Sequence, residues 1–171
     1  FSFWEIAKID FCNLLISSEF KFNNMTIWNL LTHTSGYPEG ISGPKDRLTE
    51  QDVMDKIFSI EELLFKPGTK IVYSDINYIL LGKIIEMLSG MPLNEYARIN
   101  LFEPLEMKDS EYLPSDKSCC AATEYRDDAT MTGYVKGEVH DETAYAMNKV
   151  AGHAGLFSTV KDCSHFIQMI L

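Results

Sequence analysis

The segment Lys66-Pro67-Gly68-Thr69-Lys70-Ile71-Val72-Tyr73-Ser74-Asp75, with the apolar run from Ile76 to Leu88 behind it, decides the fold. Its Pro-Gly pair breaks the chain, and Ile71-Val72-Tyr73 is typical of a short extended piece. Ser74 or Asp75 can accept hydrogen bonds from the first free N–H groups of the following helix. That helix is apolar on nearly every side, which predicts burial in the core, and Ser89-Gly90 ends it.

Periodicity and capping residues predict further helices on both sides of this core helix. We expect an amphipathic helix over residues 1–16, a short helix from Thr26 to Leu31, and helices that begin near Thr49, Pro92 and Thr159. Residues 37–48 have the turn chemistry of a loop. Tyr134-Val135 and Glu138-Val139, joined by Lys136-Gly137, predict a small hairpin. The expected fold class is mainly α with a few short strands, in a single unit over residues 1–171.

The composition is that of a globular protein with an acidic surface. Hydrophobic residues make up 46% and charged residues 23% of the 171 residues, and the net charge is −10. Phosphate binding needs clustered Lys and Arg, so this balance argues against nucleic acid and against anionic lipid as partners. We see no apolar stretch long enough to span a bilayer, and residues 1–10 lack the apolar centre of a signal peptide. The sequence leaves the compartment unknown.

The cysteines and histidines do not follow metal-binding patterns. The cysteines lack zinc-ligand spacing and are expected to be free thiols: Cys12, Cys119, Cys120 and Cys163. His33 lies at an expected helix end, where we expect it to hydrogen-bond its own backbone. His140 and His153 lack the i, i+4 spacing of helical zinc ligands. No metal site and no cofactor are therefore expected.

Three blocks of sequence, in order, resemble one family of hydrolases. The first is Leu30-Leu31-Thr32-His33-Thr34-Ser35-Gly36. The second joins Lys66-Pro67-Gly68-Thr69, Tyr73-Ser74-Asp75, Tyr78 and Leu80-Leu81-Gly82-Lys83-Ile84-Ile85-Glu86 to Phe102-Glu103-Pro104-Leu105-Glu106-Met107. The third joins Gly137-Glu138-Val139-His140-Asp141-Glu142 to Gly152-His153-Ala154-Gly155-Leu156-Phe157-Ser158-Thr159. They resemble the serine hydrolase family of class C β-lactamases and related penicillin-binding proteins and esterases.

This resemblance implies acyl transfer at a serine. A serine attacks a carbonyl, a lysine one helical turn later helps to remove its proton, and a tyrosine carries protons to the leaving group. By resemblance, Tyr73 is that catalytic tyrosine. The structural alternative is an ordinary half-buried tyrosine before a helix cap. A tyrosine titrates near pH ~10 and acts as a base only where neighbouring cations favour the phenolate.

Asp75 occupies the expected substrate-binding position but departs from the asparagine that is commoner in the family. An amide both donates and accepts hydrogen bonds, whereas a carboxylate only accepts them. Asp75 can still hold a lysine or cap the helix, and it favours a peptidase or esterase relative over a β-lactamase. Glu106 also departs from the family, in which glycine is common there because the helix end can require a positive φ.

No serine in the chain fits the nucleophile position. Ser42-Gly43-Pro44-Lys45 contains helix breakers, and Ser18-Glu19-Phe20-Lys21 lies too close to the first block. Ser158-Thr159-Val160-Lys161 is better explained as a helix cap, and Lys117 follows Ser115 one residue too early. A later Lys-Thr-Gly or His-x-Gly strand is also missing, and the chain begins without methionine. We therefore expect a partial β-lactamase/transpeptidase-like fold, its helical part, lacking most of the central antiparallel sheet.

Two functions stay open at this point. The first is a segment of a serine hydrolase acting on amide, ester or β-lactam bonds, with peptide-like, ester or β-lactam small molecules as substrates and no activity alone. The alternative is a non-catalytic helical module that binds a peptide or a partner chain. A partial domain also predicts exposed apolar surface, and hence self-association.

Overall fold

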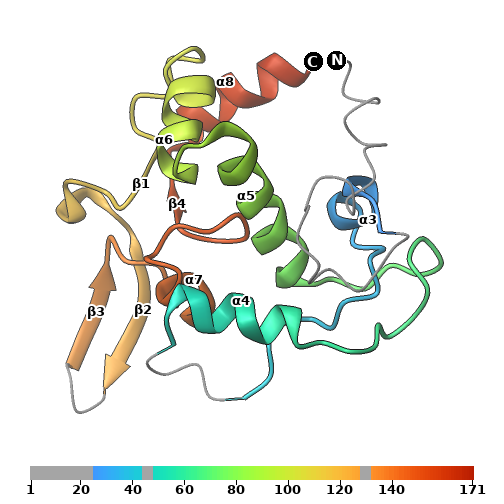
Figure 1. The fold of residues 1–171 in the computed structure, drawn as a ribbon. Helices are drawn as coiled ribbons and strands as arrows, with labels where there is room; N and C mark the ends of the chain where they lie inside the picture. Colours follow the sequence, from blue (N-terminus) through green and yellow to red (C-terminus); the bar gives the residue numbers. More distant parts are fainter. Residues whose placement is uncertain (1–24, 44–47, 128–131) are drawn as a thin grey trace.

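The computed structural model describes residues 25–43, 48–127 and 132–171. Figure 1 shows helix α5 through the middle of the molecule, with α4 and α7 near its beginning and α6 and α8 near its end. The helices of the described residues are α3 (Ile27–Leu31), α4 (Glu50–Phe58), α5 (Asp75–Ser89), α6 (Leu93–Ala97), a π-helical turn (Arg98–Phe102), a 3-10 turn (Lys117–Cys119), α7 (Glu142–Ala146) and α8 (Val160–Ile170). The helix expected over residues 1–16 lies outside the described residues.

Helix α5 forms the centre of the hydrophobic core. Ile76, Ile79, Leu80 and Ile84 are buried along it, and Gly90 ends it in the left-handed conformation (φ 68°). The predicted core helix is therefore confirmed, although its last turn leaves Leu88 exposed. Ser74 occupies the N-cap position without capping through its side chain. Its hydroxyl instead donates to the carbonyl of Pro38 (2.6 Å), because that loop lies against the start of the helix.

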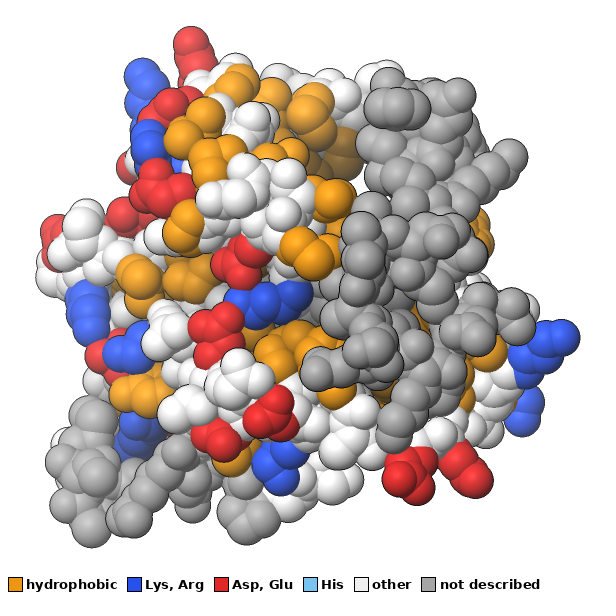
Figure 2. Space-filling model, viewed as in Figure 1, with side chains coloured by type: hydrophobic (Ala, Val, Ile, Leu, Met, Phe, Trp, Pro, Cys, Tyr) orange, Lys and Arg blue, Asp and Glu red, His pale blue; other side chains and the backbone are white. Residues whose placement is uncertain are grey.

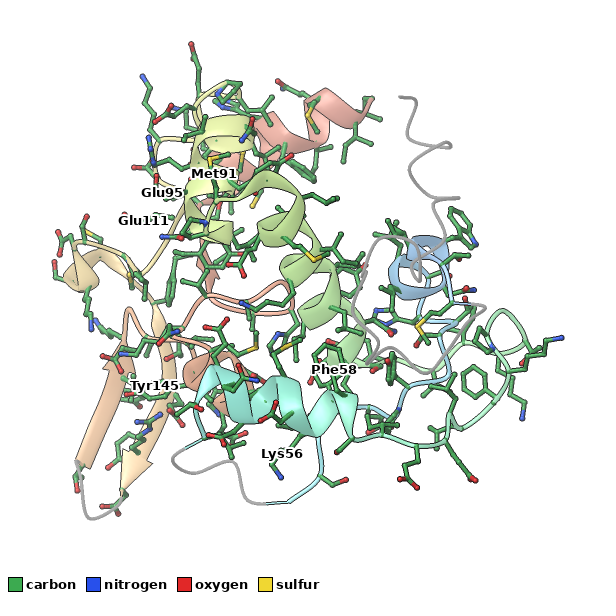
Figure 3. The ribbon with its side chains drawn as sticks, viewed as in Figure 1. Lys56, Phe58, Met91, Glu95, Glu111 and Tyr145 are labelled. Carbon is green, nitrogen blue, oxygen red and sulfur yellow. The ribbon has the colours of Figure 1, made fainter. Side chains whose placement is uncertain are left out.

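Capping boxes begin α3 and α4, which confirms the predicted cap at Thr26 and the predicted capping box at Thr49. The Thr26 hydroxyl accepts from the backbone N–H of Asn29 (3.3 Å), and the Asn29 side chain accepts from the N–H of Thr26 (3.0 Å). Thr49 begins α4 in the same way. Phe58 lies on the side of α4 that packs on the core, whereas Lys56 extends away from it and donates to the carbonyl of Ser42 (3.2 Å) (Figure 3).

Lys83 ties α5 to its neighbours through carboxylates. Its ammonium donates to Glu50 of α4 and to Glu86 (2.6 Å). Asn148, after α7, donates to the other oxygen of Glu50 (2.9 Å). Burial lowers the pKa of Lys83, but the hydrogen bonds that its ammonium donates to both carboxylates, together with their negative charges, outweigh it, so the net pKa is raised and the side chain stays charged.

Two small antiparallel sheets lie beside the helices. Strands β1 (Glu111–Tyr112) and β4 (Leu156–Phe157) form one, and β2 (Ala122–Asp127) and β3 (Thr132–Lys136) form the other. The predicted hairpin is wrong in its partner, because Tyr134 pairs with Tyr125 of β2 rather than with residues 138–139. The rings of Tyr125 and Tyr134 meet edge to face (5.2 Å), which supports the observed pairing. Gly137 (φ 63°) instead packs against Lys117 and ends the strand.

A close backbone approach fixes the loop after α7 against α5. A Cβ on Gly152 would lie 2.1 Å from the carbonyl oxygen of Tyr78, and one on Gly82 would lie 3.1 Å from the nitrogen of Gly152. Only glycine permits this contact at position 152. The approach brings the neighbouring His153 toward the first turn of α5.

At the other end of α5, buried Asp162 organises the start of α8. Its carboxylate accepts from the N–H of Asp109 (2.8 Å) and from the hydroxyl of Ser110 (2.8 Å). Thr159 caps the helix by accepting from the N–H of Asp162 (3.2 Å), as predicted. The predicted apolar face of α8 is largely exposed, since Ile167 and Ile170 are 55% and 64% accessible.

Candidate functional site

Tyr73 lies in an extended segment that is bound to the loop after α3. The N–H of Val72 donates to the carbonyl of His33 (2.9 Å), and the N–H of Asp75 donates to the carbonyl of Glu39 (2.8 Å). These bonds set the direction in which the chain enters α5. The Tyr73 side chain is 63% exposed, so its hydroxyl group is open to an incoming molecule.

His33 links the first and second sequence blocks. Its ring lies against Tyr73 (centroids 4.8 Å apart) and Tyr78 (5.1 Å). The N–H of Ser74 donates to His33 Nδ1 (3.2 Å), which places the ring proton on Nε2, and Nδ1 also contacts the amide of Asn77 (3.0 Å). The expectation that His33 bonds its own backbone is wrong for its side chain. The ring reaches across to the start of α5 because His33 adopts a positive φ of 54°.

Two buried serines near Tyr73 serve the architecture. The hydroxyl of Ser35 donates to the side-chain oxygen of Asn77 (2.6 Å) and accepts from the N–H of Tyr37 (3.1 Å). The hydroxyl of Ser74 donates to the carbonyl of Pro38. Both serines are 0–1% exposed, so neither hydroxyl can reach a substrate. They hold the blocks around Tyr73 together instead.

Asp75 is the immediate electrostatic neighbour of Tyr73. A hydrogen bond between the Tyr73 phenol and the Asp75 carboxylate raises the pKa of the tyrosine, and the negative charges of Asp75 and Asp141 raise it further. This is the opposite of what a tyrosine acting as a base requires. Among the described residues, the surroundings of Tyr73 therefore favour the neutral phenol, which can donate a proton.

Two residues of the third block complete the surroundings, and the sequence alone did not single them out as site residues. Asp141 caps α7 by accepting from the N–H of Ala144 (2.7 Å), and His153 follows the close approach at Gly152. His153 Nε2 lies 2.9 Å from Asp141 Oδ1. Asp75, Asp141 and His153 each place one possible metal-ligand atom within 4.8 Å of the others. The sequence could not predict this grouping, because Asp75 and Asp141 are more than 60 residues apart along the chain.

The Ser-x-x-Lys strings are not assembled into a nucleophile in the described part of the chain. The hydroxyl of Ser158 lies 2.7 Å from that of Ser110, beside the cap of α8. Lys117 pairs with Glu138 (2.7 Å). The string at residues 18–21, and Lys45 of the string at 42–45, lie outside the described residues.

A largely apolar pocket of about 790 Å³ lies along the other side of α5. Its walls come from α3, α5, α6 and the turn after it, and include Leu31, Ile85, Leu88, Leu101 and Leu156. Figure 2 shows hydrophobic side chains gathered on the part of the surface near α6 and α8. Within residues 25–43, 48–127 and 132–171, no single helix is long and apolar enough to cross a membrane. One bent pair, Asp75–Ser89 with Leu93–Phe102, passes that test by length and composition only.

Comparison with known proteins places the three sequence blocks in one family. Residues 18–171 match the Beta-lactamase family. N-acetylmuramyl-L-alanine amidase from Bacillus subtilis (strain 168) is 37% identical over 169 residues, which are 87% of this chain and 38% of the amidase. The chain thus spans about two fifths of the length of this relative.

Solved structures with the same fold agree with this family match. The octameric penicillin-binding protein homologue from Pyrococcus abyssi superposes with a TM-score of 0.62 at 27% identity, over 86% of this chain and 34% of that one. The β-lactamase/D-alanine carboxypeptidase from Yersinia pestis gives a TM-score of 0.63 at 23% identity, over 86% and 40%. The second of these likenesses concerns the fold alone.

Proposed function

Because the chain belongs to the β-lactamase family, we propose that it is the Tyr73-bearing segment of a serine hydrolase that acts on amide, ester or β-lactam bonds. The observation that carries the proposal is the placement of Tyr73, exposed at the start of α5 and held by the block around His33. The relative at 37% identity is named as an amidase, which supports an amide substrate. We infer that most of the central antiparallel sheet of the parent fold lies outside this segment, since the described residues form two two-stranded sheets.

In this proposal Tyr73 is the proton carrier and Asp75 its immediate partner. With its raised pKa, the neutral phenol donates a proton to the leaving group. Activation of a serine requires the reverse transfer, and the lysine of a Ser-x-x-Lys helix supplies the positive charge that favours the phenolate. In the same proposal, the Asp75 carboxylate also holds that lysine. We expect no turnover from the segment alone, because the described residues bring no serine and lysine together for Tyr73 to activate.

A chimera tests this assignment. The matching region of the Bacillus subtilis amidase would be replaced by residues 25–171, so that the host supplies the rest of its own chain, in which the proposal expects the Ser-x-x-Lys helix and the sheet. We expect hydrolysis of a chromogenic ester or cephalosporin, and a fall in kcat of about 100-fold or more in Tyr73→Phe. Tyr134→Phe is the matched control, because Tyr134 is similarly exposed (69%) but belongs to strand β3. A folded chimera without turnover, or one indifferent to Tyr73→Phe, contradicts the proposal.

One observation favours a second function, the non-catalytic module. The apolar pocket along α5 is large enough for side chains of a peptide or partner chain. The same surface supports self-association, and the Pyrococcus abyssi homologue is octameric. Sedimentation velocity over a range of concentrations tests this point. A concentration-dependent oligomer supports self-association, whereas a monomer at every concentration contradicts it.

A further inference from the structure

His153 carries a buried nitrogen that the surrounding protein leaves without a partner. Its side chain is 3% exposed, Nε2 lies 2.9 Å from Asp141 Oδ1, and Nδ1 has no hydrogen-bond partner among the described residues. Leaving a polar atom unpaired in the interior costs free energy, so buried polar atoms nearly always have a partner. A water can satisfy Nδ1, whereas Nε2, which faces Asp141, is the ring nitrogen that can join a ligand cluster with the aspartates.

The two aspartates beside His153 are held in fixed positions by backbone contacts. Asp141 Oδ1 accepts from the N–H of Ala144 at the start of α7, and Asp75 is fixed by its own N–H on Glu39. One oxygen of each carboxylate and one nitrogen of His153 lie within 4.8 Å of one another. The three side chains come from α5, the cap of α7 and the loop before β4. No rearrangement of the backbone is therefore needed to bring them together.

The distances suit a shared cation. Donor atoms about 2.0–2.2 Å from a metal lie about 3 Å apart at the ~90° angles of an octahedral site. The 2.9 Å between His153 Nε2 and Asp141 Oδ1 agrees with such a pair. An imidazole nitrogen with two carboxylates suits a transition metal such as Zn²⁺ or Mn²⁺ better than Mg²⁺, which prefers oxygen ligands alone.

We propose that Asp75, Asp141 and His153 form a binding site for one divalent transition-metal ion of the Zn²⁺ or Mn²⁺ class. Three protein ligands leave coordination positions for water or for an oxygen of a bound molecule, beside Tyr73. The expectation of no metal site rested on histidine spacing along the chain, and this site joins three separate segments. The proposal does not depend on hydrolytic activity, so its failure would leave the proposed function untouched.

Isothermal titration calorimetry on chelator-treated protein tests the site. Free thiols also bind Zn²⁺, so every protein would carry Cys12→Ser, Cys119→Ser, Cys120→Ser and Cys163→Ser. We expect one ion per chain for Zn²⁺ or Mn²⁺, and weaker binding of Mg²⁺. Asp75→Asn and Asp141→Asn should each weaken that binding by about 10-fold or more. Asn caps a helix as well as Asp does, so the Asp141 variant is expected to fold.

Matched controls separate this site from adventitious binding. Asp55→Asn removes an exposed carboxylate from α4, and His140→Gln removes an exposed histidine next to Asp141 in sequence. Both should leave the affinity unchanged, and circular dichroism of each variant checks that it is folded. The proposal is overturned if neither Zn²⁺ nor Mn²⁺ binds saturably, or if either Asp75→Asn or Asp141→Asn, once shown to be folded, binds as the parent does.

Discussion

Tyr73 combines high exposure with a strong negative field. Its phenol is bound to the Asp75 carboxylate, and Asp141 adds a second negative charge nearby. The resemblance of Tyr73-Ser74-Asp75 to a family signature was enough to predict that Tyr73 and Asp75 belong to one site. It could not supply the direction of the pKa shift of Tyr73, because that direction depends on how the Asp75 carboxylate lies against the phenol in the folded chain. The positive φ of Glu106 (56°) could be predicted from the sequence, because the family favours glycine at this position.

The pKa of Tyr73 should fall when Asp75 is replaced by Asn. Asn removes the charge that opposes the phenolate, so the pKa moves back toward the usual value near ~10. The ultraviolet absorbance of phenolate, followed during an alkaline titration, measures it after subtraction of the Tyr73→Phe curve. Asp55→Asn, which removes a carboxylate elsewhere, should leave the curve unchanged.

The same raised pKa has a consequence for stability at high pH. A folded-state pKa above the unfolded value contributes stability that is fully present below the unfolded pKa. That contribution is lost as the pH rises through the folded pKa of Tyr73. An unaltered Tyr73 titration in Asp75→Asn would show that the carboxylate is not the cause.

At the scale of elements, some of the site residues lie next to short helices, and the stability of these helices depends on their caps. Helix α3 has only five residues, and it ends directly before the turn that contains His33. A helix this short is not stable by itself, so its capping box and its packing on α5 hold it. The caps at Thr26, Thr49 and Thr159 were predictable because capping is local chemistry. The partner of β3 was not, because strand pairing depends on contacts between separate segments.

Thr26→Ala should lower the free energy of unfolding by about 1 kcal/mol, through loss of the N-cap of α3. Thr26→Ser keeps a hydroxyl in the same place and should restore most of the loss. Urea unfolding at constant m-value measures both variants. If Thr26→Ala were as stable as the parent, the capping box would have no role in holding the block around His33.

At the scale of the whole molecule, the close approach between α5 and the loop at Gly152 assembles the site. It brings the third sequence block to the first two, and so places His153 and Asp141 beside Asp75. The order of the blocks predicted the family, and the core helix predicted the centre of the fold. The grouping of Asp75, Asp141 and His153 could not be read from the sequence, since it arises only when the loop packs on α5.

Gly152→Ala should destabilise the protein by about 1–3 kcal/mol, because the added Cβ would meet the carbonyl of Tyr78 at 2.1 Å. Gly40→Ala is the matched control, since its Cβ would come no closer than 3.9 Å to Asp75. Urea unfolding of both variants provides the comparison. Equal stability of the two would show that the loop does not pack on α5 as described.

The most direct test of the central claim is covalent labelling of the purified chain by a fluorescent penicillin and a fluorophosphonate, read by mass spectrometry. In the proposed function Tyr73 is a proton carrier, and the described residues bring no nucleophilic serine to it, so we expect no acylated or phosphonylated serine on the chain alone. The chimera with the amidase should be labelled on a host serine. A stoichiometric adduct on any serine of the isolated chain, lost in Tyr73→Phe and kept in Tyr134→Phe, would contradict the account.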